Sequence, residues 1–311
     1  MPKTTLSFYL RVIAVAVVVF AVGNWLSSRT PDRAEGSPSI ISGDSSATPR
    51  NDNRESVFDR VMRTKTIRCG YATWYPNLTI DPNTGQKSGI SYDVMNRIGQ
   101  VLDLKIEWTQ EAGFGAAEQD LLSGRYDALC ADVCFEAKRT KFINFSRPFI
   151  QSPLYLIGRH DDARFDQNLA LANTSDVTVG ILRNTILDHW AQAYFPNAKQ
   201  IDISELGAET DLMMAIGAKK ADVSFNNQIS VDRYSAKNPN IIRTIGAPIG
   251  MCYSGFMLPH GDEKFKYMID SAINELIFQG EMPTIFTKYL PNDNRYWQVP
   301  KTDYAPQNAQ K

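Results

Sequence analysis

The stretch YDALCADVCFEAKRTKFINFSRPF, residues 126–149, joins an apolar segment to a dense polar cluster. Its first part, YDALCADV, predicts a buried strand. Asp132, Cys134, Glu136 and Arg139 then stand within eight positions of one another. In open α/β sheets, ligands bind outside the carboxyl ends of the strands. We therefore expect this cluster to line a ligand cleft.

Strands and helices alternate twice along the chain. Around the opening stretch, the predicted strands are TIRCGYA, KIEWTQ and YDALCADV, with helices over residues 91–104 and 116–125. The second run has the strands DVTVGIL, QIDI and ADVSF, with helices over residues 185–195 and 209–220. Such alternation is typical of parallel sheets that are covered on both faces. The segments SRPFIQSPLYLIGR and GAPIGMCYSGFML flank the second run and predict two crossing strands between two lobes.

The predicted fold is therefore α/β and two-lobed, with two parallel-type sheets joined by two crossing strands. The two terminal helices, KFKYMIDSAINELIFQG and MPTIFTKYL, are expected to pack on the first lobe. The predicted division is a signal peptide or membrane anchor over 1–26, a linker over 27–54, lobe 1 over 55–148, lobe 2 over 149–248, and a return to lobe 1 over 249–311.

The N-terminal segment predicts export. Lys3 and Arg11 precede the apolar run VIAVAVVVFAVGNWL, which is typical of a secretory signal. Cleavage near Ala21 would release the protein, whereas an uncleaved segment over residues 6–26 would tether it to the inner membrane. Either alternative places the rest of the chain in the periplasm. Residues 27–54 are rich in Ser, Pro, Asp and Arg and predict a flexible linker.

Composition excludes several classes of function. The formal net charge is −1 and 43% of the residues are hydrophobic, so nothing favours a nucleic-acid partner. The three histidines are scattered, and we expect no metal and no cofactor. Cys69, Cys130, Cys134 and Cys252 could form disulfides in an exported protein, Cys69 with Cys130 on neighbouring strands, or could stay as buried thiols.

Five ordered motifs carry a resemblance to a known family. They are YPNL (75–78) with GISYD (89–93), LLSGRYDA (121–128), EAKR (136–139) with FSRPF (145–149), VGILRNT (179–185) and DVSFNN (222–227). The chain resembles the periplasmic solute-binding proteins of amino-acid ABC transporters. That resemblance implies a two-lobed binding protein that captures a small polar solute and docks on a membrane permease. Because the expected cleft is formed within one chain, we expect a monomer.

The resemblance also implies a set of ligand-binding residues. Arg139 takes the place of the arginine that grips the ligand carboxylate, a role that a planar guanidinium suits. Asn184 and Thr185 take the place of donors at a helix start, although either could instead cap that helix. Tyr75 and Trp74 fall where an aromatic ring stacks on the ligand, although aromatic rings also fill ordinary cores.

The chain departs from the family pattern at several of these positions. Glu136 replaces a carboxylate-binding Thr, Cys134 replaces a hydroxyl residue, and Asp132 precedes both. Asn227 replaces the acid that holds the ligand's α-amino group. Either Asp132 and Glu136 neutralise Arg139, or one of them binds the cationic group of the ligand. The ligand is thus expected to bear a carboxylate, as an amino acid or a related compound does.

Two other functions remain open at this point. A membrane-tethered sensor would use the uncleaved anchor and the linker. An enzyme of the dehydratase type on the same scaffold would use Asp132, Glu136 and Cys134 as acid–base groups. We favour a binding protein without catalytic activity, because the sequence contains no Ser-His-Asp or Cys-His constellation.

Overall fold

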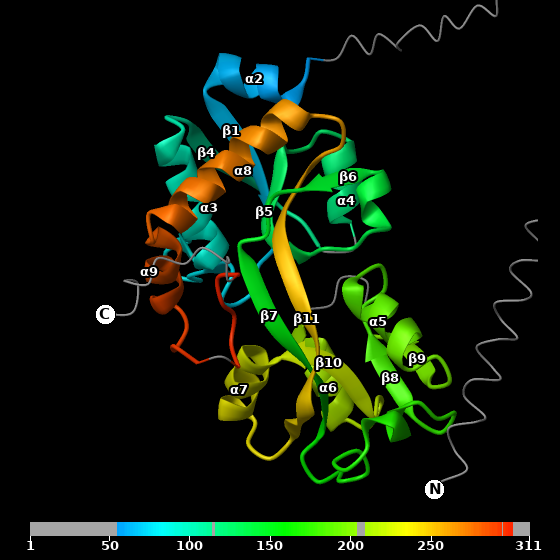
Figure 1. Ribbon diagram of the computed structural model, residues 1–311. Helices are drawn as coiled ribbons and strands as arrows, with labels where there is room; N and C mark the ends of the chain where they lie inside the picture. The colour runs from blue at the N-terminus through cyan, green and yellow to red at the C-terminus, as the bar shows by residue number, and fades with distance from the viewer. Residues whose placement is uncertain (1–54, 114–115, 204–208, 294, 301–311) are drawn as a thin grey trace, which may run out of the picture. The chain divides into compact units, whose positions relative to one another are not determined.

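The computed structural model in Figure 1 describes residues 55–113, 116–203, 209–293 and 295–300. The predicted signal or anchor over residues 1–26 and the linker over residues 27–54 lie outside these ranges. Within the described ranges, no helix is long and apolar enough to cross a membrane.

A nine-stranded sheet runs in the order β4-β1-β5-β11-β7-β10-β8-β9, with β6 paired to β11. The bounds of these strands are β1 Thr66–Tyr71, β4 Lys105–Glu111, β5 Ala128–Cys134, β6 Ile143–Phe145, β7 Ile150–Arg159, β8 Thr178–Ile181, β9 Lys199–Asp202, β10 Val223–Asn227 and β11 Ile242–Pro259. The short strands β2 (Thr79–Ile80) and β3 (Lys87–Ser88) form a separate hairpin.

Helices flank the two ends of the sheet, and the middle of β7 and β11 runs between these two groups (Figure 1). Their bounds are α2 Val57–Thr64, α3 Ile90–Val101, α4 Ala117–Leu122, α5 Ile186–Tyr194, α6 Glu209–Gly217, α7 Gln228–Lys237, α8 Glu263–Phe278 and α9 Glu281–Thr287, with 3₁₀ turns η1 (Arg139–Lys141) and η2 (Leu169–Ala172). Every strand and helix predicted above is present, with ends shifted by a few residues. Helices α2 and α7 were not predicted.

The two crossing strands are β7 and β11, and they merge the two predicted sheets into one. They pair antiparallel from Ile150 with Ser254 to Arg159 with Ile242, with a register shift between Ile245 and Gly250. The β1–β4, β1–β5, β8–β9 and β8–β10 pairs are parallel. The predicted α/β fold with two lobes and two crossing strands is confirmed, and hydrogen bonds through β7 and β11 make its sheet continuous. The predicted lobe boundaries at residues 148 and 248 stay predictions.

Each lobe has its own apolar core. In the first lobe, helix α3 buries Val94 and Ile98 against Ile67 of β1 and against Ile269 and Ile273 of α8. These residues recur every three or four positions on their helices, so each helix turns one apolar face to the sheet. The terminal helices therefore pack on the first lobe, as predicted. The second lobe is built in the same way around Val179 and Ile181 of β8 and Val223 and Phe225 of β10.

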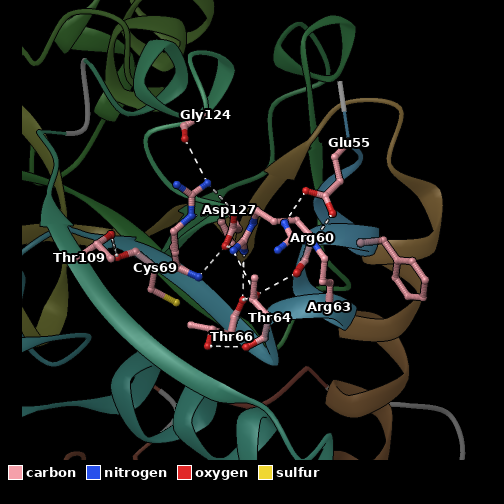
Figure 2. Close-up of polar contacts among 12 residues, drawn as sticks. Glu55, Arg60, Arg63, Thr64, Thr66, Cys69, Thr109, Gly124 and Asp127 are labelled. Atoms are coloured by element: carbon pink, nitrogen blue, oxygen red, sulfur yellow. Dashed lines mark hydrogen bonds and ion pairs between the residues drawn. The ribbon is translucent and has the colours of Figure 1, made fainter. Parts of the chain in front are cut away.

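A buried carboxylate fixes the start of strand β5. Asp127, the acid of the LLSGRYDA motif, is fully buried. Its carboxylate accepts hydrogen bonds from the backbone N–H of Arg68 at 2.6 Å, from the Arg68 guanidinium at 2.8 Å, and from Arg60 of α2 (Figure 2). Arg68 also donates to the backbone carbonyl of Gly124. A buried charge is tolerated when it is paired and hydrogen-bonded, so this motif has a structural role that joins α2, β1 and β5.

Two disulfides hold strand β5 on both sides. Cys69 of β1 is bonded to Cys130 of β5, and Cys134 at the end of β5 is bonded to Cys252 of β11. Of the alternatives that the sequence left open, the pairing of Cys69 with Cys130 is the one that the structure has. The alternative of buried free thiols is wrong, because all four cysteines are paired.

Candidate functional site

A cavity of about 420 Å³ lies between residues of the two lobes. From the first lobe it is lined by helix α4 and by the turn that follows β5, and from the second lobe by helix α5. Its lining residues are Glu118, Gln119, Glu136, Lys138, Arg139, Asn184, Thr185, Asp188, His189 and Gln192. The volume is within the range of small-molecule sites.

Within the described part of the chain, the Arg139 side chain has one hydrogen-bond partner at the cavity. Its Nε donates to Oε2 of Glu118 at 3.1 Å, and its side chain is 13% exposed. The hypothesis that Asp132 and Glu136 neutralise Arg139 is therefore wrong, since the partner is Glu118 of α4. Among the described residues, neither Nη atom of Arg139 has a hydrogen-bond partner. Both Nη atoms can therefore donate hydrogen bonds to the two oxygens of a carboxylate.

Asn184 and Thr185 line the cavity from the second lobe, where β8 turns into α5. Asn184 has φ 59°, a left-handed conformation that Asn tolerates better than most residues. The Thr185 hydroxyl accepts from the Leu187 N–H at 3.3 Å and donates to the Leu182 carbonyl at 2.6 Å. Thr185 is thus the cap of α5, one of the two alternatives left open above. Its hydroxyl proton is already used, so a ligand would meet its remaining lone pair.

Glu136 also lines the cavity, and its side chain is half-buried. It lies on the same short turn as Arg139, because the Arg139 backbone N–H donates to the Glu136 carbonyl at 3.1 Å. Among the described residues, no hydrogen bond or ion pair engages the Glu136 carboxylate. One turn therefore presents opposite charges to one cavity.

Cys134 and Asp132 do not line this cavity. The Cys134 sulfur is in a disulfide with Cys252, so it has no thiol proton to donate to a ligand, and the ligand-binding role of Cys134 stays a prediction. Asp132 accepts a hydrogen bond from the Ser254 hydroxyl of β11 at 3.3 Å. Both side chains point to the crossing strand β11. The polar residues at the end of β5 are therefore divided between this strand and the cavity.

Tyr75 and Trp74 lie in a different region, where helix α7 meets the first lobe. The Arg233 guanidinium lies over the Tyr75 ring, 4.2 Å from its centroid, and the Tyr75 hydroxyl donates to the Tyr289 carbonyl at 3.1 Å. Trp74 packs near Trp297, with ring centroids 6.4 Å apart. These aromatic side chains also pack against the first-lobe core. Their contacts in the structure are therefore those of core residues and not those of rings that face the cavity.

Asn227 lies at the start of α7 and is 3% exposed. Its Oδ1 accepts from the Ser230 N–H at 3.0 Å, so it caps the helix. Asp222 belongs to a separate network, because its carboxylate accepts from the Thr178 N–H and pairs with Arg159 and Arg164.

The structure thus brings together four of the nine predicted site residues, and the other five lie elsewhere. Arg139, Glu136, Asn184 and Thr185 line the cavity, whereas Trp74, Tyr75, Asp132, Cys134 and Asn227 do not.

Six lining residues were not predicted, namely Glu118, Gln119, Lys138, Asp188, His189 and Gln192. Thr185, Asp188, His189 and Gln192 recur at helical spacing and form one polar face of α5, a signal that is visible in TILDHWAQAYF. Glu118 and Gln119 gave no such signal, because their place at the cavity depends on how α4 packs. Within the ranges that the structure describes, no three His, Cys, Asp or Glu side chains lie close enough to hold a metal ion.

Comparison with known proteins agrees with this architecture. Residues 67–292 match the family of bacterial extracellular solute-binding proteins, family 3. A Haemophilus influenzae protein named "Probable amino-acid ABC transporter-binding protein" is 22% identical over 185 residues, which are 59% of this chain and 68% of that protein.

Two further matches differ in kind. The crystal structure of the ancestral amino acid-binding protein AncCDT-1, a precursor of cyclohexadienyl dehydratase, has a TM-score of 0.65 at 20% identity. The match covers 76% of this chain and 100% of that one. The virulence sensor protein BvgS of Bordetella pertussis is 26% identical over 193 residues, which are 60% of this chain and 14% of the sensor.

Proposed function

We propose that this chain, which belongs to the bacterial extracellular solute-binding proteins of family 3, captures a small carboxylate-bearing solute for uptake by an ABC transporter. The solute is an amino acid or a related compound. The protein acts in the periplasm as a monomer, and its partner is the membrane permease of the transporter. The relative from Haemophilus influenzae supports this class of function.

One observation carries the proposal. Arg139 lines a cavity that both lobes form, and among the described residues only its Nε is engaged, by Glu118. The two remaining nitrogens suit a carboxylate in two parallel hydrogen bonds. Asn184 and Thr185 face the same cavity from the second lobe, so one ligand would contact both lobes and favour their closure.

Calorimetric titration of the full exported chain against amino acids and organic acids tests this function. A carboxylate ligand should bind to the wild type and lose at least about 30-fold in affinity in Arg139→Ala, because a partly buried charge pair is lost. Arg125→Ala is the matched control, since Arg125 pairs with Asp120 outside the cavity. Binding that is indifferent to Arg139, or binding only of compounds without a carboxylate, would refute the proposal.

A membrane-tethered sensor is the second candidate. The similarity to BvgS favours it, although the match covers only 14% of that protein. Mass spectrometry of the N-terminus of the exported chain separates the two functions. A chain that begins after residue 21 would be a free binding protein, and a chain that retains residues 1–26 would be tethered.

A further inference from the structure

The charges of the cavity show which part of a ligand each wall can hold. Three carboxylates line it, on Glu118, Glu136 and Asp188. Glu118 is paired with Arg139 at 3.1 Å. Asp188 accepts from the Gln192 amide at 2.7 Å and lies 3.9 Å from Arg183. Glu136 is the one of the three that no described residue engages, so it is the carboxylate with capacity for a cation.

The neighbouring region at α7 offers no such carboxylate. Asn227 is neutral and caps the helix. Asp232 has an acceptor bond on each oxygen, from Gln228 at 2.7 Å and from the Tyr296 hydroxyl at 2.6 Å. Arg233 adds a guanidinium there, stacked on Tyr75. A ligand ammonium placed in that region would meet a cation and would find both oxygens of Asp232 occupied.

Glu136 and Arg139 are close in the chain but do not pair with each other. The backbone hydrogen bond between them fixes the turn, and both side chains reach the same cavity. A zwitterion carries an ammonium and a carboxylate separated by one carbon, and it would satisfy both side chains at once. An organic acid without an amino group would leave the Glu136 charge uncompensated in a half-buried place, which is unfavourable.

We propose that Glu136 binds the ammonium group of the ligand, so that the Glu136–Arg139 turn recognises the zwitterionic head group of an α-amino acid. This inference rests on the proposed function, because it assigns the carboxylate to Arg139. It places recognition of the ammonium on the first lobe and assigns none of it to Asn227. The second lobe then contributes polar contacts from α5.

The test compares each amino acid with the same acid lacking its amino group. The probes are L-alanine with propionate, L-leucine with 4-methylpentanoate, and L-arginine with 5-guanidinopentanoate, titrated into the full exported chain. The wild type should prefer the amino acid of the bound pair at least tenfold. Glu136→Gln, which keeps the shape of the side chain, should reduce that preference below threefold, because it weakens binding of the amino acid and removes the uncompensated charge that disfavours the acid. Glu107→Gln, an acid outside the cavity, should keep the tenfold preference.

The outcomes separate the two proposals. If the wild type binds amino acids through Arg139 and Glu136→Gln keeps the full preference, the inference is overturned and the proposed function stands. The same holds if the wild type binds both members of a pair equally well. If no amino acid and no organic acid of the wider panel binds, the proposed function and this inference are both overturned. Circular dichroism of each variant shows whether a lost affinity reflects a lost fold.

Discussion

Asp127 and Arg139 lie beyond opposite ends of strand β5, and their charges are satisfied to different degrees. The Asp127 carboxylate is fully buried and accepts from two arginines and a backbone N–H (Figure 2). Among the described residues, the Arg139 guanidinium makes one hydrogen bond, to Glu118, beside a cavity. A group whose bonds are all made within the chain has no capacity left for a ligand. The charged groups that can bind a ligand are therefore those whose hydrogen-bonding capacity the fold leaves partly unused.

Removal of Asp127 should give the largest effect on stability. Asp127→Ala would leave Arg60 and Arg68 without their buried partner, which typically costs about 3–5 kcal/mol. Chemical denaturation measures the loss, and the folded fraction should still bind its ligand with wild-type affinity. If the free energy of unfolding of Asp127→Ala stays within about 1 kcal/mol of the wild-type value, Asp127 does not have the stabilising role that sets it apart from Arg139.

The disulfide at the end of β5 should come next. Cys134→Ser with Cys252→Ser should lower the free energy of unfolding by about 2–4 kcal/mol, because it releases a long loop in the unfolded chain. Ligand affinity should change less than threefold, because neither residue lines the cavity. A large loss of affinity with little loss of stability would return Cys134 to the binding site.

An acid in the second lobe extends the comparison to pH. The Arg164 guanidinium, which hydrogen-bonds Asp162, holds the pKa of that carboxyl below its usual range. A lowered pKa in the folded state stabilises the protein above the unfolded pKa of about 3.9 and stops doing so as pH falls through the folded value. Asp162→Asn should therefore lose about 1–2 kcal/mol at pH 7. That difference from the wild type should shrink below about pH 4 and vanish at lower pH, as measured by urea denaturation across pH. A constant difference would contradict the assignment.

Release of Arg139 from its partner should give the smallest effect on stability. Glu118→Gln removes one partly exposed ion pair and should change stability by less than about 1 kcal/mol. The affinity for a carboxylate ligand should rise severalfold, because Arg139 no longer shares its charge. Calorimetry checks this, with Arg139→Ala as the reference. A fall in affinity would mean that Glu118 orients Arg139 for the ligand.

Local patterns predicted most of the fold and part of the site. Strand and helix periods placed the elements, and the EAKR and VGILRNT motifs named Glu136, Arg139, Asn184 and Thr185, which meet at the cavity. The contacts that decide each role are tertiary. The Glu118–Arg139 pair depends on how α4 packs, and the Arg233–Tyr75 stack depends on α7, a helix with a weak apolar period that the sequence did not reveal. The periodicity of a sequence shows which face of one helix or strand is apolar. It does not show which residues of two different elements contact each other.

The Cys134–Cys252 bond also has a topological consequence. It joins the chain where it leaves for the second lobe to the chain where it returns, between two cysteines that are 118 positions apart in sequence. Residues 134–252, which include the second lobe, therefore form a covalent ring that this disulfide closes. A protease that cuts any loop within that ring would leave both pieces attached, in place, to the first lobe. In an environment that contains proteases, a single nick in the second lobe need not release a fragment.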